Sequence, residues 1–257
     1  MRYIIQSYIR FFYRSTNKHG VHSPFVYKFV TKCLNDKTNY SEYKQMQEYR
    51  LNLYRDKNEI TVKDFGAGSR VFKNNTRRIS KIARVAGMTS KRQKLLYRIT
   101  KYLNCQNILE LGTSLGLGTL SMALASKGKV TTVEGCPETL KTAQNYFQHF
   151  NIQNVWTVNE NFTSFLSELP ASEKYDLIYI DGNHSGTSTL HYFELLLNHI
   201  HNDTLIIFDD IYWSKEMTNA WKEIIKNPKV RVSIDTFQWG FVFFRNEQQK
   251  EHFTIRV

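Results

Sequence analysis

The chain has 257 residues, 41% of them hydrophobic, and a formal net charge of +12 at pH 7. This length and composition predict a globular protein with a full hydrophobic core, and no apolar run approaches the roughly 20 residues of a membrane-spanning helix. The first residues lack the apolar segment of a signal peptide, and the three cysteines do not have metal-ligand spacing, so we expect a protein of the reducing cytoplasm.

The positive charge is concentrated in the N-terminal part of the chain. Residues 1–104 hold 23 Lys and Arg against 6 Asp and Glu, a net charge of +17, whereas residues 105–257 hold 12 against 17, a net charge of −5. A basic segment attracts anionic partners, but it can equally be a solvated surface. The sequence leaves both interpretations open.

Residues 1–14 predict an amphipathic helix that is rich in aromatic and basic side chains. Its apolar stripe consists of Ile4, Ile5, Tyr8, Ile9 and Phe12. Such a helix can dock on its own domain, on a second copy in a homodimer, or on an anionic membrane surface as a peripheral contact at the inner face. We favour docking on protein over docking on a membrane.

The next segment predicts further helices and one glycine-rich loop. Helical periodicity continues over residues 26–60 and 76–103 without indicating a chemistry. Residues 64–69, D-F-G-A-G-S, are rich in glycine, but no strand that ends in an acid follows at the spacing of a nucleotide site. We expect this loop either to line a substrate entrance or to be a purely structural turn.

From residue 107 onward, short apolar runs alternate with amphipathic segments, which predicts a mostly parallel sheet with helices on both faces. Strands are expected at 107–111, 130–134, 154–158, 175–180 and 204–208, and helices at 117–126, 137–150, 162–168, 187–200 and 214–226. Residues 230–235 and 238–244 predict a hairpin, so the last strand should run antiparallel. We therefore expect a Rossmann-like α/β domain with a seven-stranded sheet in residues 91–257, preceded in residues 1–90 by a helical basic extension for substrate, lid or partner contacts.

The most informative stretch, residues 107–118, reads N-I-L-E-L-G-T-S-L-G-L-G and predicts a strand, a glycine turn and a helix. Glycine lets the backbone turn tightly and approach a ligand, and the helix N-terminus offers free N–H groups. A second apolar run ends in Glu134, whose carboxylate can accept hydrogen bonds from both hydroxyls of a ribose. The four-residue step from Gly112 to Gly116 departs from the G-x-G-x-x-G spacing of nicotinamide dehydrogenases, which disfavours that cofactor.

Two further apolar runs end in carboxylates, within the motifs D-G-N-H and F-D-D. Because each run predicts a buried strand, Asp181, Asp209 and Asp210 should emerge at adjacent strand ends. Converging carboxylates repel each other unless a cation or protons neutralise them, and oxygen-only ligands suit Mg²⁺ or Ca²⁺. Two alternatives stay open: His184 or Asp181 acts as a general base without a metal, or Asp209 and Asp210 only cap the next helix.

The glycine stretch resembles motif I of the class I S-adenosylmethionine-dependent methyltransferases, in which a strand is followed by E/D-x-G-x-x-x-G-x-G. The matching positions are held by Glu110, Gly112, Gly116 and Gly118, with Glu134 as the ribose-binding acid. Within this class, E-L-G-T-S-L-G, Y-I-D-G-N-H and F-D-D are most similar to the small-molecule O-methyltransferase branch that includes catechol O-methyltransferase. The resemblance covers roughly residues 90–245, and the fold that it implies has an antiparallel seventh strand.

The resemblance implies a role for each matching residue. The residues implied to contact S-adenosylmethionine are Glu110, Gly112, Thr113, Ser114, Gly116, Gly118, Glu134, Gly135, Asn161 and Asp181. In the family, the glycine turn holds the amino-acid part of the cofactor, and Asn161 stands where the adenine amino group is bound. Catechol-type enzymes bind a metal with an Asp and an Asp-Asn pair, which correspond here to Asp181, Asp209 and Asp210, the last in place of Asn. The residues implied in catalysis are Asp181, His184 and Asp209.

These features predict an enzyme that transfers a methyl group from S-adenosylmethionine to a hydroxyl or carboxyl oxygen of a small or medium acceptor, with or without a metal. One alternative is a nucleic-acid methyltransferase that uses the basic N-terminal region, although D-G-N-H stands where amino-methylating enzymes have N/D-P-P-Y/F. Another is a non-catalytic, membrane-associated binding protein on the same scaffold, against which the intact glycine motif argues.

Overall fold

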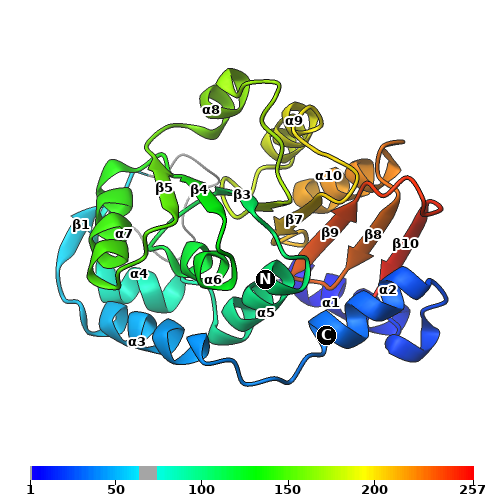
Figure 1. The fold of residues 1–257 in the computed structure, drawn as a ribbon, viewed down its shortest axis with the longest axis horizontal. Helices are drawn as coiled ribbons and strands as arrows, with labels where there is room; N and C mark the ends of the chain where they lie inside the picture. The colour runs from blue at the N-terminus through cyan, green and yellow to red at the C-terminus, as the bar shows by residue number, and fades with distance from the viewer. Residues whose placement is uncertain (1, 64–73) are drawn as a thin grey trace. The chain divides into compact units, whose positions relative to one another are not determined.

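The computed structural model describes residues 2–63 and 74–257, and the glycine-rich loop predicted at residues 64–69 lies outside these ranges. The chain divides into two compact units, which are described separately (Figure 1). Residues 36–165 form the glycine-turn unit. Residues 1–35 and 166–257 form the terminal unit, which carries both ends of the chain.

The compact units do not follow the boundary that the sequence predicts at residue 90. Residues 1–35 of the basic extension group with the C-terminal strands, and residues 36–90 group with the glycine turn. The reason is that the extension has no core of its own and packs on two different parts of the α/β fold. A role of residues 1–90 in binding substrate or partners stays a prediction.

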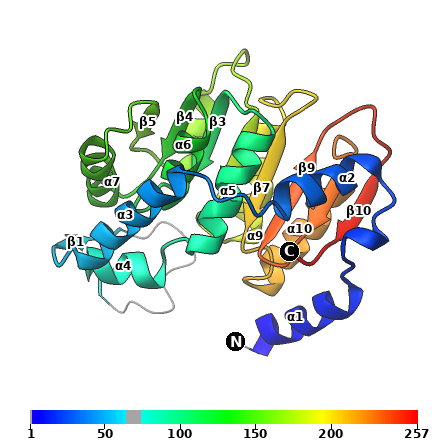
Figure 2. The same ribbon diagram turned by 60° about the horizontal axis from the view of Figure 1, so that its bottom comes forward.

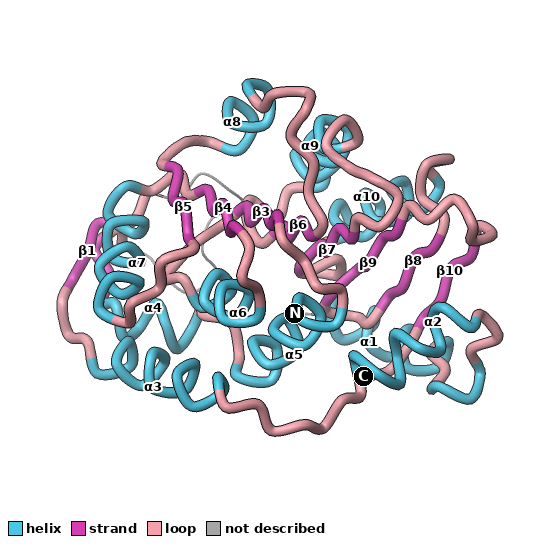
Figure 3. The backbone as a smooth tube through the Cα atoms, in the orientation of Figure 1, coloured by secondary structure: helices cyan, strands magenta, loops and turns pink. Residues whose placement is uncertain are grey.

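The glycine-turn unit is built on three parallel strands, β3 (Asn107–Leu111), β4 (Lys129–Val133) and β5 (Val155–Val158), which pair in this order (Figure 3). The apolar side chains of β3 are fully buried, as expected of a parallel strand with both faces covered. The helices of this unit are α3 (Glu42–Arg55), α4 (Ile79–Val85), α5 (Ser90–Tyr102), α6 (Leu117–Ala125) and α7 (Pro137–His149). Strands β1 (Glu59–Thr61) and β2 (Thr76–Arg78) pair in antiparallel orientation. Helix α8 (Phe162–Glu168) has residues in both units.

The terminal unit contains five strands in the order β10-β8-β9-β7-β6. They are β6 (Leu177–Ile180), β7 (Leu205–Asp209), β8 (Val232–Asp235), β9 (Trp239–Phe243) and β10 (Glu251–Thr254). Strands β6 and β7 run parallel, β9 is antiparallel to both β7 and β8, and β10 is parallel to β8. The predicted hairpin is therefore confirmed.

Helices cover both faces of these strands. Helix α2 (Pro24–Phe29) places Phe29 against Phe241 of β9. Helix α10 (Lys215–Lys226) places Trp221 against Gly240, where a Cβ on the glycine would lie 2.7 Å from the indole ring. Neighbouring residues of a strand face opposite sides of the sheet, so α10 at Gly240 and α2 at Phe241 lie on opposite faces of these strands (Figure 2). The remaining helices of the unit are α1 (Arg2–Arg14) and α9 (Gly186–Leu196).

Helix α1 docks on its own unit, and of the apolar stripe that the sequence predicts, Tyr8 takes part by contacting Phe237 at 4.9 Å between ring centroids. The side chains that it buries are Ser7 and Phe11, and Phe11 contacts the ring of Phe237 at 5.5 Å between centroids. The predicted stripe is largely exposed, with Ile5, Ile9 and Phe12 each about half accessible. Among the described residues, no helix is long and apolar enough to cross a membrane.

The Rossmann-like α/β class is confirmed, with one strand more than expected. All seven strands predicted from residue 107 onward are present as β3 to β9. Strand β10 was not predicted, and residues 76–78, which we assigned to a helix, form β2. Both segments are short and polar, so their strand conformation depends on a partner that is distant in the sequence.

Candidate functional site

The turn after β3 requires glycine. Gly112 and Gly116 have φ of 109° and 77°, in the left-handed region that side chains other than glycine rarely adopt. A Cβ at Gly116 would also lie 2.5 Å from the ring of Phe147 and 2.7 Å from the hydroxyl of Tyr49. The amide of Gly112 donates to the carbonyl of Val133 at 2.9 Å, so the turn is fixed to the end of β4. Sequence and packing thus impose one conformation at the start of α6.

We expect Gly116→Ala to lower the free energy of unfolding by about 1–3 kcal/mol. Alanine is unfavourable at this positive φ, and its methyl group would also clash with the buried side chains of Phe147 and Tyr49. Urea unfolding measures this cost. Adding Phe147→Leu should recover the packing part of the loss and leave the backbone part. An unchanged unfolding midpoint in Gly116→Ala would contradict the geometry of the turn.

Glu134 lies directly after β4 and contacts the same turn. Its carboxylate accepts hydrogen bonds from the amides of Ser114 (2.9 Å) and Cys136 (3.0 Å), and the side chain is half-buried. Ser114 has φ of 48°, so the backbone is strained where it meets this carboxylate. The structure therefore brings Glu134 together with Gly112, Thr113 and Ser114, whose cofactor contacts stay a prediction.

Glu110 lies inside the protein rather than on the surface of the turn. It is 1% exposed, and its carboxylate accepts hydrogen bonds from the hydroxyls of Thr119 and Thr132. Burial raises the pKa of Glu110 to about 8, which the two hydroxyls oppose only in part. Glu110 thus links β3, β4 and α6 beneath the turn.

The other predicted cofactor residues have different surroundings. Asn161 caps α8, since its Oδ1 accepts from the amide of Ser164 at 2.9 Å and its Nδ2 donates to the hydroxyl of Ser164 at 2.7 Å. Gly118 is buried in the first turn of α6. The side chain of Asn159, which our sequence interpretation missed, donates to the carbonyls of Glu134 (2.7 Å) and Gly135 (3.3 Å). Asn159 therefore holds the backbone that follows β4.

In the terminal unit, Asp181 follows β6 and Asp209 ends β7. The register that pairs Ile180 with Phe208 places the two carboxylates at the same edge. The hydroxyl of Tyr179 lies 2.6 Å from Oδ2 of Asp209 and 3.1 Å from Oδ2 of Asp181. A phenol has one proton, so Tyr179 donates to one carboxylate at a time. Sequence analysis missed Tyr179, although residues i and i+2 of a strand share a face and its place two residues before Asp181 was a usable signal.

Strained backbone surrounds these carboxylates. Three residues other than glycine, Asn183, His184 and Asp210, have φ of 66°, 39° and 51°. Such conformations persist where the surrounding structure enforces them, and they are common at functional sites. The ring of His184 packs 5.5 Å from that of Trp213, and its Nε2 lies 4.0 Å from Oδ1 of Asp181.

Asp209 already has hydrogen-bond partners within the protein. Asp209 accepts from Tyr179 and, at 2.7 Å, from the amide of Asp210, while Ser214 caps α10. In the described part of the chain, no three His, Cys, Asp or Glu side chains are grouped so that they could hold a metal ion. Metal binding by Asp181, Asp209 and Asp210 stays a prediction. Trp239 is buried next to these carboxylates, with its ring packed against that of Tyr179.

Comparison with known proteins identifies the domain that carries these residues. Residues 109–211 match a family model described as a methyltransferase domain. No curated protein sequence matches the chain.

The chain is similar to three solved structures. One is a methyltransferase of Podospora anserina bound to SAH, with a TM-score of 0.61 and 12% identity over 88% of this chain and 97% of that chain. Another is the O-methyltransferase from Bacillus cereus in complex with SAH, with a TM-score of 0.54 and 19% identity over 84% and 94% of the two chains. The third is the O-methyltransferase TomG from Streptomyces achromogenes, involved in tomaymycin synthesis and in complex with SAM, with a TM-score of 0.56 and 11% identity over 85% and 94%.

At these identities the likeness to solved structures establishes the fold, and the family model adds the activity class of residues 109–211. The glycine turn and Glu134 lie within that range. The chain therefore carries a methyltransferase domain on the class I fold, and its resemblance to the S-adenosylmethionine-dependent methyltransferases is confirmed.

Proposed function

We propose that this methyltransferase moves the methyl group of S-adenosylmethionine to a hydroxyl or carboxyl oxygen of a small or medium acceptor. The observation that carries the proposal is the contact between Glu134 and the amide of Ser114, which joins a ribose-type acid to a glycine turn at a helix N-terminus. Two of the similar proteins are O-methyltransferases, which supports transfer to oxygen.

When bound, S-adenosylmethionine would supply a methyl group that leaves its sulfonium sulfur for the acceptor oxygen, with S-adenosylhomocysteine as the leaving group. The glycine turn lets the backbone approach the cofactor closely, and Glu134 accepts hydrogen bonds from its ribose hydroxyls. His184 or Asp181 takes the proton that the acceptor hydroxyl releases.

Calorimetric titration with S-adenosylhomocysteine tests the cofactor site. We expect micromolar binding by the wild type and a loss of about a hundredfold in Glu134→Ala, because two hydrogen bonds to a charged group are removed. Glu48→Ala is the matched control, since Glu48 is an exposed carboxylate of the same unit. Absence of binding by the wild type would exclude the proposed cofactor. Equal binding by Glu134→Ala would exclude its ribose role.

Repeating the titration with Mg²⁺ or Ca²⁺ tests the metal prediction. A gain in affinity that Asp209→Asn abolishes would support a metal held by the carboxylates. No change on adding either ion would favour proton transfer by His184 or Asp181 alone.

A nucleic-acid acceptor is the second candidate, because residues 1–104 carry a net charge of +17. Neutralising several phosphates would make RNA binding fall steeply with salt. Methyl transfer from labelled S-adenosylmethionine to RNA and to a panel of phenols and carboxylic acids separates the two candidates.

A further inference from the structure

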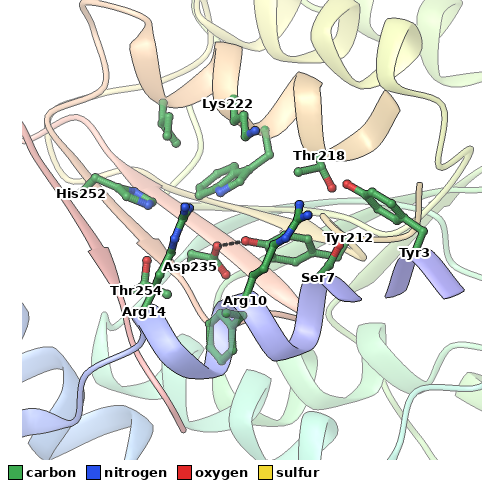
Figure 4. A pocket seen from close by; sticks show the side chains of 13 residues that line it. Tyr3, Ser7, Arg10, Arg14, Tyr212, Thr218, Lys222, Asp235, His252 and Thr254 are labelled. Atoms are coloured by element: carbon green, nitrogen blue, oxygen red, sulfur yellow. Dashed lines mark hydrogen bonds between the residues drawn. The ribbon is translucent and has the colours of Figure 1, made fainter. Parts of the chain in front are cut away.

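A pocket of about 360 Å³ lies within the terminal unit, between α1, α10 and strands β8 and β10 (Figure 4). Both chain ends contribute to its walls, since α1 begins the chain and β10 nearly ends it. None of the predicted cofactor, catalytic or metal residues lines it. The pocket is therefore distinct in composition from the site described above.

Three cationic side chains line this pocket. Arg10 and Arg14 come from successive turns of α1, and Lys222 comes from α10. Figure 4 shows their charged ends directed into the same space. Within the described part of the chain, none of the three makes a hydrogen bond or salt bridge. Like charges four residues apart on a helix repel each other, so this arrangement is unfavourable until an anion enters.

The acid among the residues that line the pocket, Asp235, already has partners. Its carboxylate accepts from the hydroxyl of Tyr212 at 2.5 Å and from the amide of Phe237 at 2.8 Å, and the side chain is buried. Burial also raises the pKa of Asp235 above its ordinary value, an effect that the two hydrogen bonds oppose. Asp235 therefore does not neutralise three cations, and the pocket keeps an excess of positive charge.

We infer that this pocket binds a phosphate group. A phosphate monoester carries close to two negative charges at neutral pH and three acceptor oxygens, which match the excess of three cations over one carboxylate. Two arginines offer the planar donor geometry that phosphate takes, and Ser7 and Thr218 add hydroxyls at the wall. A single carboxylate would leave positive charge unmatched.

The phosphate can come from a soluble phosphate ester or from a lipid headgroup. The lipid source has a structural argument of its own, because α1 exposes Ile5, Ile9 and Phe12 beside the arginines that line the pocket. An exposed apolar face with adjacent cations is suited to an anionic membrane surface. The two sources share the same cationic pocket and differ in whether the apolar face takes part.

Titration calorimetry with inorganic phosphate and with glycerol phosphate tests the soluble source, and flotation with phosphatidylcholine vesicles, with or without phosphatidic acid, tests the lipid source. We expect Arg10→Gln, Arg14→Gln and Lys222→Gln each to weaken binding about tenfold, since each removes one charge-assisted contact. Arg2→Gln is the matched control: the same helix, the same charge change, and no place in the pocket.

The inference is supported if the protein binds either the soluble phosphates or the phosphatidic acid vesicles, and if the pocket variants reduce that binding while Arg2→Gln does not. The probe that binds then identifies the source of the phosphate. No binding in either arm would overturn it. An equal loss in Arg2→Gln would also overturn it, because the attraction would then come from overall charge. Thermal unfolding of each variant shows that the fold is retained. Since the probes contain no cofactor, failure here is distinguishable from failure of the methyltransferase proposal.

Discussion

The free energy of unfolding of the wild type should fall as the pH rises from the ordinary glutamate pKa of about 4.3 to the pKa of Glu110, about 8. Glu110→Gln is expected to abolish this pH dependence. Burial raises the pKa of Glu110 in the folded state, so the folded protein keeps a proton that the unfolded chain releases in this window. The stabilising effect of the protonated side chain is complete below the lower pKa and is lost as the pH rises through the upper one. Glutamine resembles the protonated carboxyl group but does not titrate.

The free energy of unfolding of Glu110→Gln minus that of the wild type should therefore increase with pH, by on the order of 3 to 5 kcal/mol across the window. Urea unfolding at a series of pH values measures this difference, from which the other titrating groups cancel. Glu48→Gln, which changes an exposed glutamate of the same unit, should follow the wild type at every pH. Parallel curves for Glu110→Gln and the wild type would show that Glu110 is ionised in the folded state.

Gln93→Leu is expected to destabilise the protein by about 2–4 kcal/mol, because it breaks a buried polar network. Arg50 of α3 donates to the carbonyl of Met88 at 2.6 Å and to the side-chain oxygen of Gln93, and Gln93 donates to the carbonyl of Leu117 at 2.8 Å. Gln93 is 1% exposed and Arg50 is also buried. Leucine at position 93 would leave a buried guanidinium short of an acceptor and would remove one of the donors to the carbonyl of Leu117, which also accepts from the hydroxyl of Ser121.

A double-mutant cycle tests whether the two side chains act together. Arg50→Met removes the buried charge, so Arg50→Met with Gln93→Leu should cost less than the sum of the single changes. Urea unfolding provides the free energies, and titration with S-adenosylhomocysteine should show weaker binding by Gln93→Leu, because Leu117 begins the helix after the glycine turn. A cost within about 0.5 kcal/mol for Gln93→Leu would mean that the network contributes nothing.

Several strands and the glycine turn could be predicted because their signals are local. The apolar runs of β3, β4, β6 and β7 need no partner to be recognised, and the hairpin of β8 and β9 follows from the short connection between them. The φ of Gly112 and Gly116 agrees with the reason that the sequence offers for glycine at these positions.

The remaining features depend on contacts that no local pattern encodes. Strand β10 exists because β8 offers it a free edge, and β2 exists because β1 does. The motif predicts the presence of Glu110 but not that Thr119 and Thr132 turn its carboxylate inward. For the same reason, no local pattern indicates that Asn161 caps a helix or that Asp209, on another strand, lies within hydrogen-bonding distance of the hydroxyl of Tyr179.

The joining of the two chain ends in the terminal unit has a consequence for synthesis. The amide of Thr16 donates to the carbonyl of Thr254 at 2.9 Å, and the amide of Arg256 donates back to the carbonyl of Thr16 at 3.1 Å. Thr16 therefore reaches these partners only after residues 254–256 have been synthesised, whereas residues 36–165 form a compact unit of their own. A nascent chain stalled before Phe237, the residue that Phe11 contacts, should therefore keep α1 undocked and open to chaperones.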